Sequence, residues 1–189
     1  LSRWLGRLLR RVFPAIRIDY GPMNSQQGRQ RLVTGLIELA RPAAVLETGT
    51  YLGTTARFFA ERTDSPIFST EVNPGFHRDA AATLAGFGHV HLKLADSRAA
   101  LREWAADGAV PKEGVLFYLD AHWHEDLPLA EELQLITDTW RDSLVLIDDF
   151  EVPGDPDYMF DDYGPGKRLC LDIVPVAVRD ACTPLFPSL

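Results

Sequence analysis

Short apolar runs alternate with stretches of helical periodicity along most of the chain. Each apolar run is nearly continuous, which is typical of strands that are buried on both faces of a sheet. The stretches between them repeat apolar positions with the period of a helix that has one face on a core. We therefore predict strands at residues 43–47, 67–71, 90–95, 115–120 and 144–148, and helices at residues 26–40, 54–62, 76–84, 97–106 and 127–140.

The regular alternation of strand and helix predicts one fold class. A strand, a helix and a second strand give parallel pairing, and the helices then cover both faces of the sheet. Crossover connections of this kind are right-handed. The predicted fold is α/β, with a Rossmann-like, doubly wound and mainly parallel sheet.

The C-terminal part of the chain is less regular. Residues 151–166 are rich in Pro, Gly, Asp and Tyr and predict a long loop, which in a compact domain is usually functional or disordered. Residues 167–180 have a helical pattern that Pro175 should kink or end. A sixth strand is predicted to begin within residues 183–189.

Residues 1–13 differ from the rest of the chain in charge. They contain several arginines and no acidic residue, with apolar residues at helical spacing. A basic amphipathic helix of this kind lies on a membrane surface, packs on its own domain or forms a dimer contact, and packing is favoured because one short helix binds lipid weakly. We divide the chain into an N-terminal accessory segment, residues 1–25, and one domain, residues 26–189.

The overall charge excludes some classes of partner. The 189-residue chain has 19 basic and 27 acidic residues, a formal net charge of −8. Nucleic-acid binding needs a basic surface, so we expect no nucleic-acid partner.

No apolar run approaches the ~18 residues of a membrane-spanning helix, so we expect no stable membrane insertion. Cys170 and Cys182 lack the spacing of a zinc site, and a reduced, cytoplasmic protein is expected.

The most informative segment follows the first predicted strand. The apolar run ends on Glu47, Gly49 and Gly53 follow, and a helical pattern begins at Thr54. A strand, a glycine turn and a helix start bring backbone N–H groups to a ligand at the carboxyl end of the strand. The sequence here has no Gly-x-Gly pair of the kind that approaches a pyrophosphate, so the turn suits an adenosine-type ligand without a pyrophosphate.

Acidic residues lie at the end of every predicted strand. In an open α/β sheet the ligand lies outside the carboxyl ends of the strands, so these acids are aimed at one crevice. An acid after the second strand, here Glu71, can accept hydrogen bonds from both hydroxyls of a ribose. Asp96 and Ser97 lie where an adenine ring would be, although either also suits the cap of the next helix. The strand-end acids are Glu47, Glu71, Asp96, Asp120, Asp148 and Asp149.

Asp120, Asp148 and Asp149 form a second group, after the fourth and fifth strands. Clustered carboxylates repel one another, and the pKa of one of them rises. A divalent cation such as Mg²⁺ relieves this repulsion by binding carboxylates, waters and substrate oxygens. The alternative is that Asp148 faces the amine of a cofactor and Asp149 caps a loop.

Two histidines and a tryptophan follow the fourth strand. His122 lies two residues beyond the strand end and is a candidate general base or further metal ligand. Trp123 can cover a bound ligand, and the face of its ring can attract a positively charged sulfonium group on such a ligand. The alternative is that Trp123 packs within the loop. His124 is expected to face solvent.

Taken together, these residues resemble the class I S-adenosylmethionine-dependent methyltransferases. The resemblance covers roughly residues 26–189 and rests on the glycine turn and on the acids after each of the strands. It implies S-adenosylmethionine as the cofactor. The cofactor-binding residues that it implies are Glu47, Gly49, Thr50, Tyr51, Gly53, Glu71, Asp96, Ser97 and Asp120.

Asp120 and the Asp148-Asp149 pair resemble, more narrowly, the metal-dependent O-methyltransferases of the catechol and macrocin kinds. This implies Mg²⁺ on Asp120, Asp148 and Asp149, where the ion holds two substrate oxygens and lowers the pKa of the one to be methylated. His122 and Asp120 are then the catalytic residues.

Two features depart from the family pattern. Catechol-type enzymes carry Asn as the last metal ligand and Lys near the first, where this chain has Asp149 and His122 or His124. The family sheet usually ends in an antiparallel hairpin of strands six and seven, and this sequence ends where strand six would begin. The C-terminal hairpin is therefore expected to be incomplete.

The predicted reaction is methyl transfer to an oxygen of a small polar acceptor such as a sugar, a phenol or a secondary metabolite, assisted by Mg²⁺. A homodimer that forms through the N-terminal helix is a further possibility that the sequence leaves undecided. One alternative is a non-catalytic module that binds a nucleoside cofactor. The other is an NAD-linked or nucleotide-sugar Rossmann enzyme, which would need the missing Gly-x-Gly-x-x-Gly.

Overall fold

Parallel strands form the centre of the molecule. The computed structural model describes residues 19–122, 126–155 and 159–187. In these residues one five-stranded sheet has the order β3-β2-β1-β4-β5, and each neighbouring pair is parallel. The predicted strands and fold class are confirmed, with small shifts at strand ends. The strands are β1 (Ala44–Thr48), β2 (Ile67–Glu71), β3 (Val90–Leu94), β4 (Val115–Leu119) and β5 (Leu144–Ile147).

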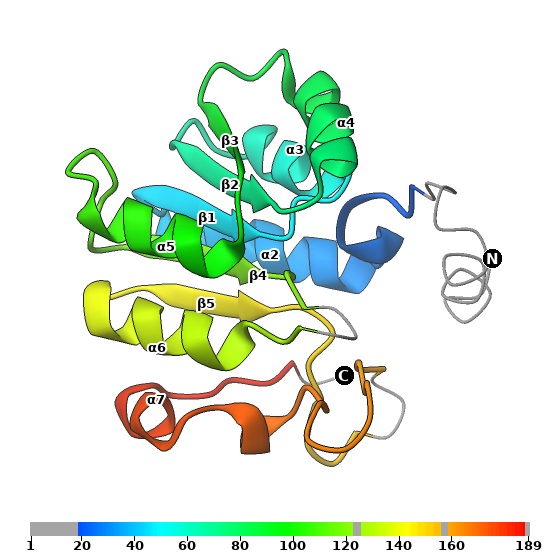
Figure 1. Cartoon of the computed structure of the whole chain (residues 1–189), viewed down its shortest axis with the longest axis vertical. Coiled ribbons are helices and arrows are strands. Elements are labelled where there is room, and N and C mark those ends of the chain that lie inside the picture. The colour runs from blue at the N-terminus through cyan, green and yellow to red at the C-terminus, as the bar shows by residue number, and fades with distance from the viewer. Residues whose placement is uncertain (1–18, 123–125, 156–158, 188–189) are drawn as a thin grey trace.

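Helices cover both faces of this sheet, as the near-continuous apolar strands predict. One face packs on α2 (Gln27–Ala40) and α3 (Thr54–Ala60), and α4 (Pro74–Leu84) packs beside α3. The other face packs on α5 (Ser97–Ala106), α6 (Leu129–Thr139) and α7 (Val176–Ala181). Figure 1 shows α5 and α6 side by side along the strands.

The strand order reverses between β1 and β4. Chain crossovers leave β1 towards β2 and β3 on one side and continue to β4 and β5 on the other. At such a reversal the loops after two adjacent strands separate and leave room for a ligand at their carboxyl ends. The turn after β1 and the loop after β4 therefore form the two sides of the expected site.

The C-terminal segment differs from its prediction. The single helix predicted for residues 167–180 is wrong, because the chain forms a 3-10 turn, η2 (Leu171–Ile173), and then α7, with Pro175 as the residue before α7. The predicted break at Pro175 is confirmed, since proline cannot donate a helical hydrogen bond.

The predicted sixth strand is also wrong within the described residues, since residues 183–187 form no strand. Pro184 and Pro187 lack the N–H groups that a strand ladder needs.

The described part of the N-terminal segment is attached to the core. The 3-10 turn η1 (Pro22–Ser25) places Met23, only 2% exposed, among the buried residues of the α2–α3 face. The backbone N–H of Met23 donates to Thr55 Oγ1 at 3.2 Å. The amphipathic helix predicted for residues 1–13 lies outside the described residues, and the domain division at residue 25 stays a prediction.

Among the helices that the structure describes, none is both long enough and apolar enough to span a membrane.

Candidate functional site

The glycine turn after β1 is built on left-handed backbone. Gly49 and Gly53 have φ angles of 83° and 81°, which other residues adopt at a cost. A Cβ on Gly49 would lie 2.3 Å from the carbonyl oxygen of Asp120. A Cβ on Gly53 would lie 3.2 Å from Cα of Ala80 in α4. The first glycine therefore lets the turn touch the end of β4, and the second lets α3 approach α4.

Backbone hydrogen bonds join this turn to the end of β2. The N–H groups of Gly49 and Thr50 donate to the carbonyl of Thr70 at 3.0 and 3.1 Å. The N–H of Tyr51 donates to Glu71 Oε2 at 2.7 Å, and Glu71 Oε1 accepts from the N–H of Asn73 at 2.8 Å. The structure thus brings Glu71 directly beside the turn, as the predicted ribose site requires.

Glu47 lies inside β1, because the strand continues to Thr48. Its carboxyl accepts a hydrogen bond from Ser69 Oγ, which also lies 2.5 Å from Thr50 Oγ1. Complete burial raises the pKa of Glu47 to about 8, so the side chain is protonated at neutral pH. Ser69 therefore links the buried Glu47 carboxyl to Thr50 in the turn. A contact between Glu47 and a cofactor stays a prediction.

Asp96 and Ser97 lie at the start of α5, beside the end of β2. The sequence left open whether one of them caps this helix, and Asp96 does, since it accepts from the N–H of Arg98 at 2.9 Å. The Arg98 guanidinium also pairs with Asp96 and with Asp126, each at 2.6 Å. The hydrogen bond from Arg98 lowers the pKa of Asp96. Asp96 is therefore a fixed, ionised group at the expected adenine end of the site.

Glu132 of α6 is a neighbour of the site that was not predicted from the sequence. It is 1% exposed and hydrogen-bonds with Ser97, and burial raises its pKa to about 7. Its position in the sequence could have identified Glu132, because it lies on the buried face of the helix with Leu129, Leu133 and Ile136. A carboxyl on an apolar helix stripe indicates a polar partner across the interface.

The acids after β5 pair with an arginine from α2. Arg29 forms an ion pair with Asp148, and its Nη1 lies 3.5 Å from Asp149 Oδ1. Asp148 Oδ1 also accepts from the N–H of Asp149 at 3.0 Å. Asp149 has a left-handed φ of 48°, which turns the chain directly after the strand. Arg29 is not among the site residues predicted from the sequence. Its spacing of four residues from Val33, which is itself four residues before Ile37, places it on the buried stripe of α2.

Asp120 and His122 lie together after β4. His122 Nε2 is 3.6 Å from Asp120 Oδ1 and has no hydrogen-bond partner among the described residues. Burial lowers the pKa of His122, so its imidazole is neutral at neutral pH. Although 37% of the Asp120 side chain is exposed, loss of solvation and the nearby charge of Asp149 raise its pKa.

The loop after β5 adds a further carboxylate. Asp161 is buried, its N–H donates to the carbonyl of Asp149 at 2.9 Å, and its carboxylate accepts from the hydroxyl of Tyr163. Its charge acts on both Asp120 and His122. The composition of residues 151–166 shows that the loop is rich in Asp but does not single out Asp161, because only tertiary folding returns this residue to the strand ends.

The side chains as arranged do not fit a resident magnesium ion. No group of three His, Cys, Asp or Glu side chains in the described residues has a metal-binding arrangement. Arg29 holds the two carboxylates of Asp148 and Asp149 that such an ion would need. Magnesium stays a prediction that requires Arg29 to move. Trp123 and His124 lie outside the described residues.

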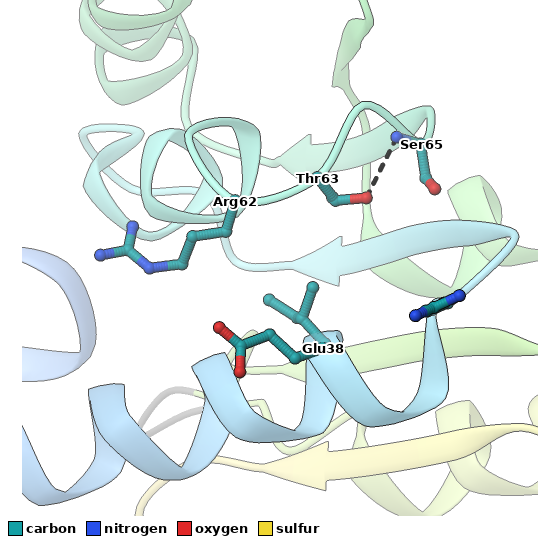
Figure 2. A pocket seen from close by; sticks show the side chains of 6 residues that line it. Glu38, Arg62, Thr63 and Ser65 are labelled. Atoms are coloured by element: carbon teal, nitrogen blue, oxygen red, sulfur yellow. Dashed lines mark hydrogen bonds between the residues drawn. The ribbon is translucent and has the colours of Figure 1, made fainter.

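Figure 2 shows a pocket at the opposite end of the sheet, next to the residues that precede β1 and β2. Arg62 in this pocket donates to the carbonyl of Phe58 at 2.8 Å and lies over the Phe58 ring. The pocket contains none of the predicted site residues. Its lining is Ile37, Glu38, Arg41, Arg62, Thr63 and Ser65.

Solved structures of methyltransferases share this architecture. The O-methyltransferase TomG of Streptomyces achromogenes, in complex with SAM, matches with a TM-score of 0.57 and 20% identity over 84% of this chain and 73% of its own. The SAH-bound methyltransferase PaMTH1 of Podospora anserina gives 0.54 and 18%, over 66% of this chain and 53% of its own. An O-methyltransferase of Bacillus cereus in complex with SAH gives 0.53 and 13%, over 72% and 59%.

These likenesses define the class of fold. The chain has the Rossmann-like fold of class I S-adenosylmethionine-dependent methyltransferases. It spans less than two thirds of the length of the Podospora and Bacillus proteins. No protein-family model matches the sequence.

Proposed function

We propose that this chain is an S-adenosylmethionine-dependent methyltransferase that acts on an oxygen of a small polar acceptor. The observation that carries the proposal is the contact between Glu71 and the N–H of Tyr51. It places a carboxylate at the end of β2 against a glycine turn, on a fold that related proteins use to bind this cofactor. The left-handed glycines fit this arrangement, because they let the turn lie directly against the residue after β4 and against α4.

The residues around the turn hold the nucleoside. Glu71 uses one lone pair on each oxygen for backbone N–H groups and has others left for ribose hydroxyls. Asp96 and the first residues of α5 face the adenine end. When bound, S-adenosylmethionine supplies the electrophilic methyl group on its sulfonium. The protein contributes mainly by positioning the acceptor oxygen in line with it.

His122 is the proposed general base. Its neutral Nε2 has no hydrogen-bond partner among the described residues and is free to accept the proton of the acceptor hydroxyl. The carboxylates of Asp149 and Asp161 favour the protonated imidazole that results. These two carboxylates thus stabilise the positive charge that the imidazole of His122 gains when it accepts the proton. The magnesium-assisted form of the reaction is tested by comparing rates with Mg²⁺ and with a chelator.

Binding of S-adenosylhomocysteine by calorimetry tests the cofactor site. Wild-type protein should bind, and Glu71→Gln should bind about tenfold more weakly or worse, because charged hydrogen bonds to the ribose are lost. Glu61→Gln at the end of α3, an exposed acid paired with Arg57, is the matched control and should bind like wild type.

Three outcomes separate the proposal from its alternatives. No binding by wild-type protein would sink the cofactor assignment. Binding of NADH in its place would favour a Rossmann oxidoreductase. Binding of S-adenosylhomocysteine without methyl transfer in a screen of sugars, phenols and other small hydroxyl compounds would leave a cofactor-binding module.

A further inference from the structure

Arg29 reaches the carboxyl ends of β4 and β5 from the opposite end of the sequence. It belongs to α2, while its partners Asp148 and Asp149 follow β5. The arginine side chain is 9% exposed, and the Asp148 side chain is buried with it. This is an internal ion pair, held by the same helix face that carries Val33 and Ile37 into the core.

The charges around this pair are unbalanced without the arginine. The negative charges of Asp149 and Asp161 both act unfavourably on the Asp120 carboxylate, and the positive charge of Arg29 opposes them. Asp148 Oδ2 is buried and has no hydrogen bond among the described residues, so its charge depends on Arg29. Leaving a buried carboxylate without its partner is strongly destabilising.

The arginine and a divalent ion compete for the same oxygens. A guanidinium presents several donors in one plane and can serve two neighbouring carboxylates. A magnesium ion at the same place would need those carboxylates as ligands and would lie next to a positive charge. Only one of the two cations can neutralise the Asp148-Asp149 pair at a time.

We propose that Arg29 is the built-in counter-charge of the β4–β5 acid cluster and stands in the place of a divalent cation. Arg29 is a positioning residue, since it holds Asp148 and Asp149 and through them the surroundings of Asp120 and His122. The consequence for catalysis rests on the proposed function: methyl transfer by the wild-type protein does not depend on Mg²⁺. The cation preference of the acid cluster is independent of that function.

Metal rescue of an arginine variant tests the proposal. We use Mn²⁺ as the probe, because it accepts oxygen ligands and its binding is seen directly by electron paramagnetic resonance. Arg29→Gln should lower the melting temperature and should bind Mn²⁺ about tenfold more tightly than wild type or better, as the acids lose their internal cation. Mn²⁺ should then restore the melting temperature of this variant and leave that of wild type unchanged.

Three further variants define the effect. Arg29→Lys keeps a charge and should stay close to wild type in Mn²⁺ binding, which also serves if Arg29→Gln folds poorly. Adding Asp149→Asn to Arg29→Gln should remove the gained Mn²⁺ binding. Arg31→Gln, two residues along α2 and exposed, should behave as wild type throughout.

Two results would overturn the proposal. One is tight Mn²⁺ binding by wild-type protein that Asp149→Asn abolishes, since Arg29 would then yield to the metal. The other is an Arg29→Gln variant with unchanged stability and unchanged Mn²⁺ binding. Calorimetry with S-adenosylhomocysteine on the same samples reports on the proposed function separately, because the proposed nucleoside contacts are at the turn after β1, the end of β2 and the start of α5.

Discussion

Glu132 shows how one buried carboxyl couples this fold to pH. The group lies between α6 and α5 beside Ser97, and burial raises its pKa from 4.5 to about 7. Between these values the unfolded chain releases the proton while the folded protein keeps it. Stability therefore falls as pH rises through this window, and the loss is complete above about pH 7.

Glu132→Gln should remove this dependence. Relative to wild type, the variant should gain up to roughly 3 kcal/mol of unfolding free energy between about pH 5 and about pH 8. Urea denaturation at both pH values measures the difference. Glu131→Gln, the exposed neighbour that pairs with Arg102, is the control and should leave the pH dependence in place. A constant difference between variant and wild type at both pH values would mean that Glu132 is ionised in the folded protein.

The other site residues fall into two groups: those placed by their local sequence, and those placed by contacts with segments that are distant in the sequence. Gly49, Gly53 and Glu71 have positions that follow from local sequence, in the turn after β1 and at the end of β2. Arg29 and Asp161 acquire theirs only when α2 and the loop after β5 reach the same strand ends.

At the scale of elements, the turn between β1 and α3 is the part most sensitive to substitution. It touches the backbone of Asp120 at one end and α4 at the other. Its N–H groups are held by the end of β2. A change in the turn therefore moves the contacts of three strands together.

Gly49→Ala should be damaging, because the new Cβ meets the Asp120 carbonyl and the residue keeps a positive φ. We expect a loss of about 1–3 kcal/mol in unfolding free energy and weaker binding of S-adenosylhomocysteine. Denaturation and calorimetry measure the two effects. Gly35→Ala in α2, where a Cβ meets open space, should instead be neutral or stabilising by up to about 1 kcal/mol. Equal behaviour of the two alanine variants would contradict this account of the turn.

The elements predicted best are those with a strong local period. The five strands and the five helices α2 to α6 were predicted at their places, because alternating buried strands and one-sided helices leave a direct pattern in the sequence. The C-terminal segment was predicted poorly, because Pro175, Pro184 and Pro187 outweigh a weak apolar pattern.

At the scale of the whole molecule, a ligand that binds only the folded protein should stabilise it. S-adenosylhomocysteine at about 100 times its dissociation constant should add about 2.7 kcal/mol of stability. For a domain of this size the melting temperature should then rise by roughly 5–10 °C. Thermal unfolding with the ligand, and with NADH as the comparison, measures this. A rise with NADH alone would contradict the cofactor proposal.

The sequence by itself determined the α/β class, the strand and helix order, the glycine turn and the acids at the strand ends. These features are local, since each depends on the period or spacing of neighbouring residues. Only the tertiary structure decided which charges meet. It placed Arg29 against Asp148 and Asp149, brought Asp161 back to His122, and buried Glu132 beside Ser97. Such contacts depend on how α2, α6 and the loop after β5 pack around the sheet. The spacing of residues along the chain does not determine which of these segments meet.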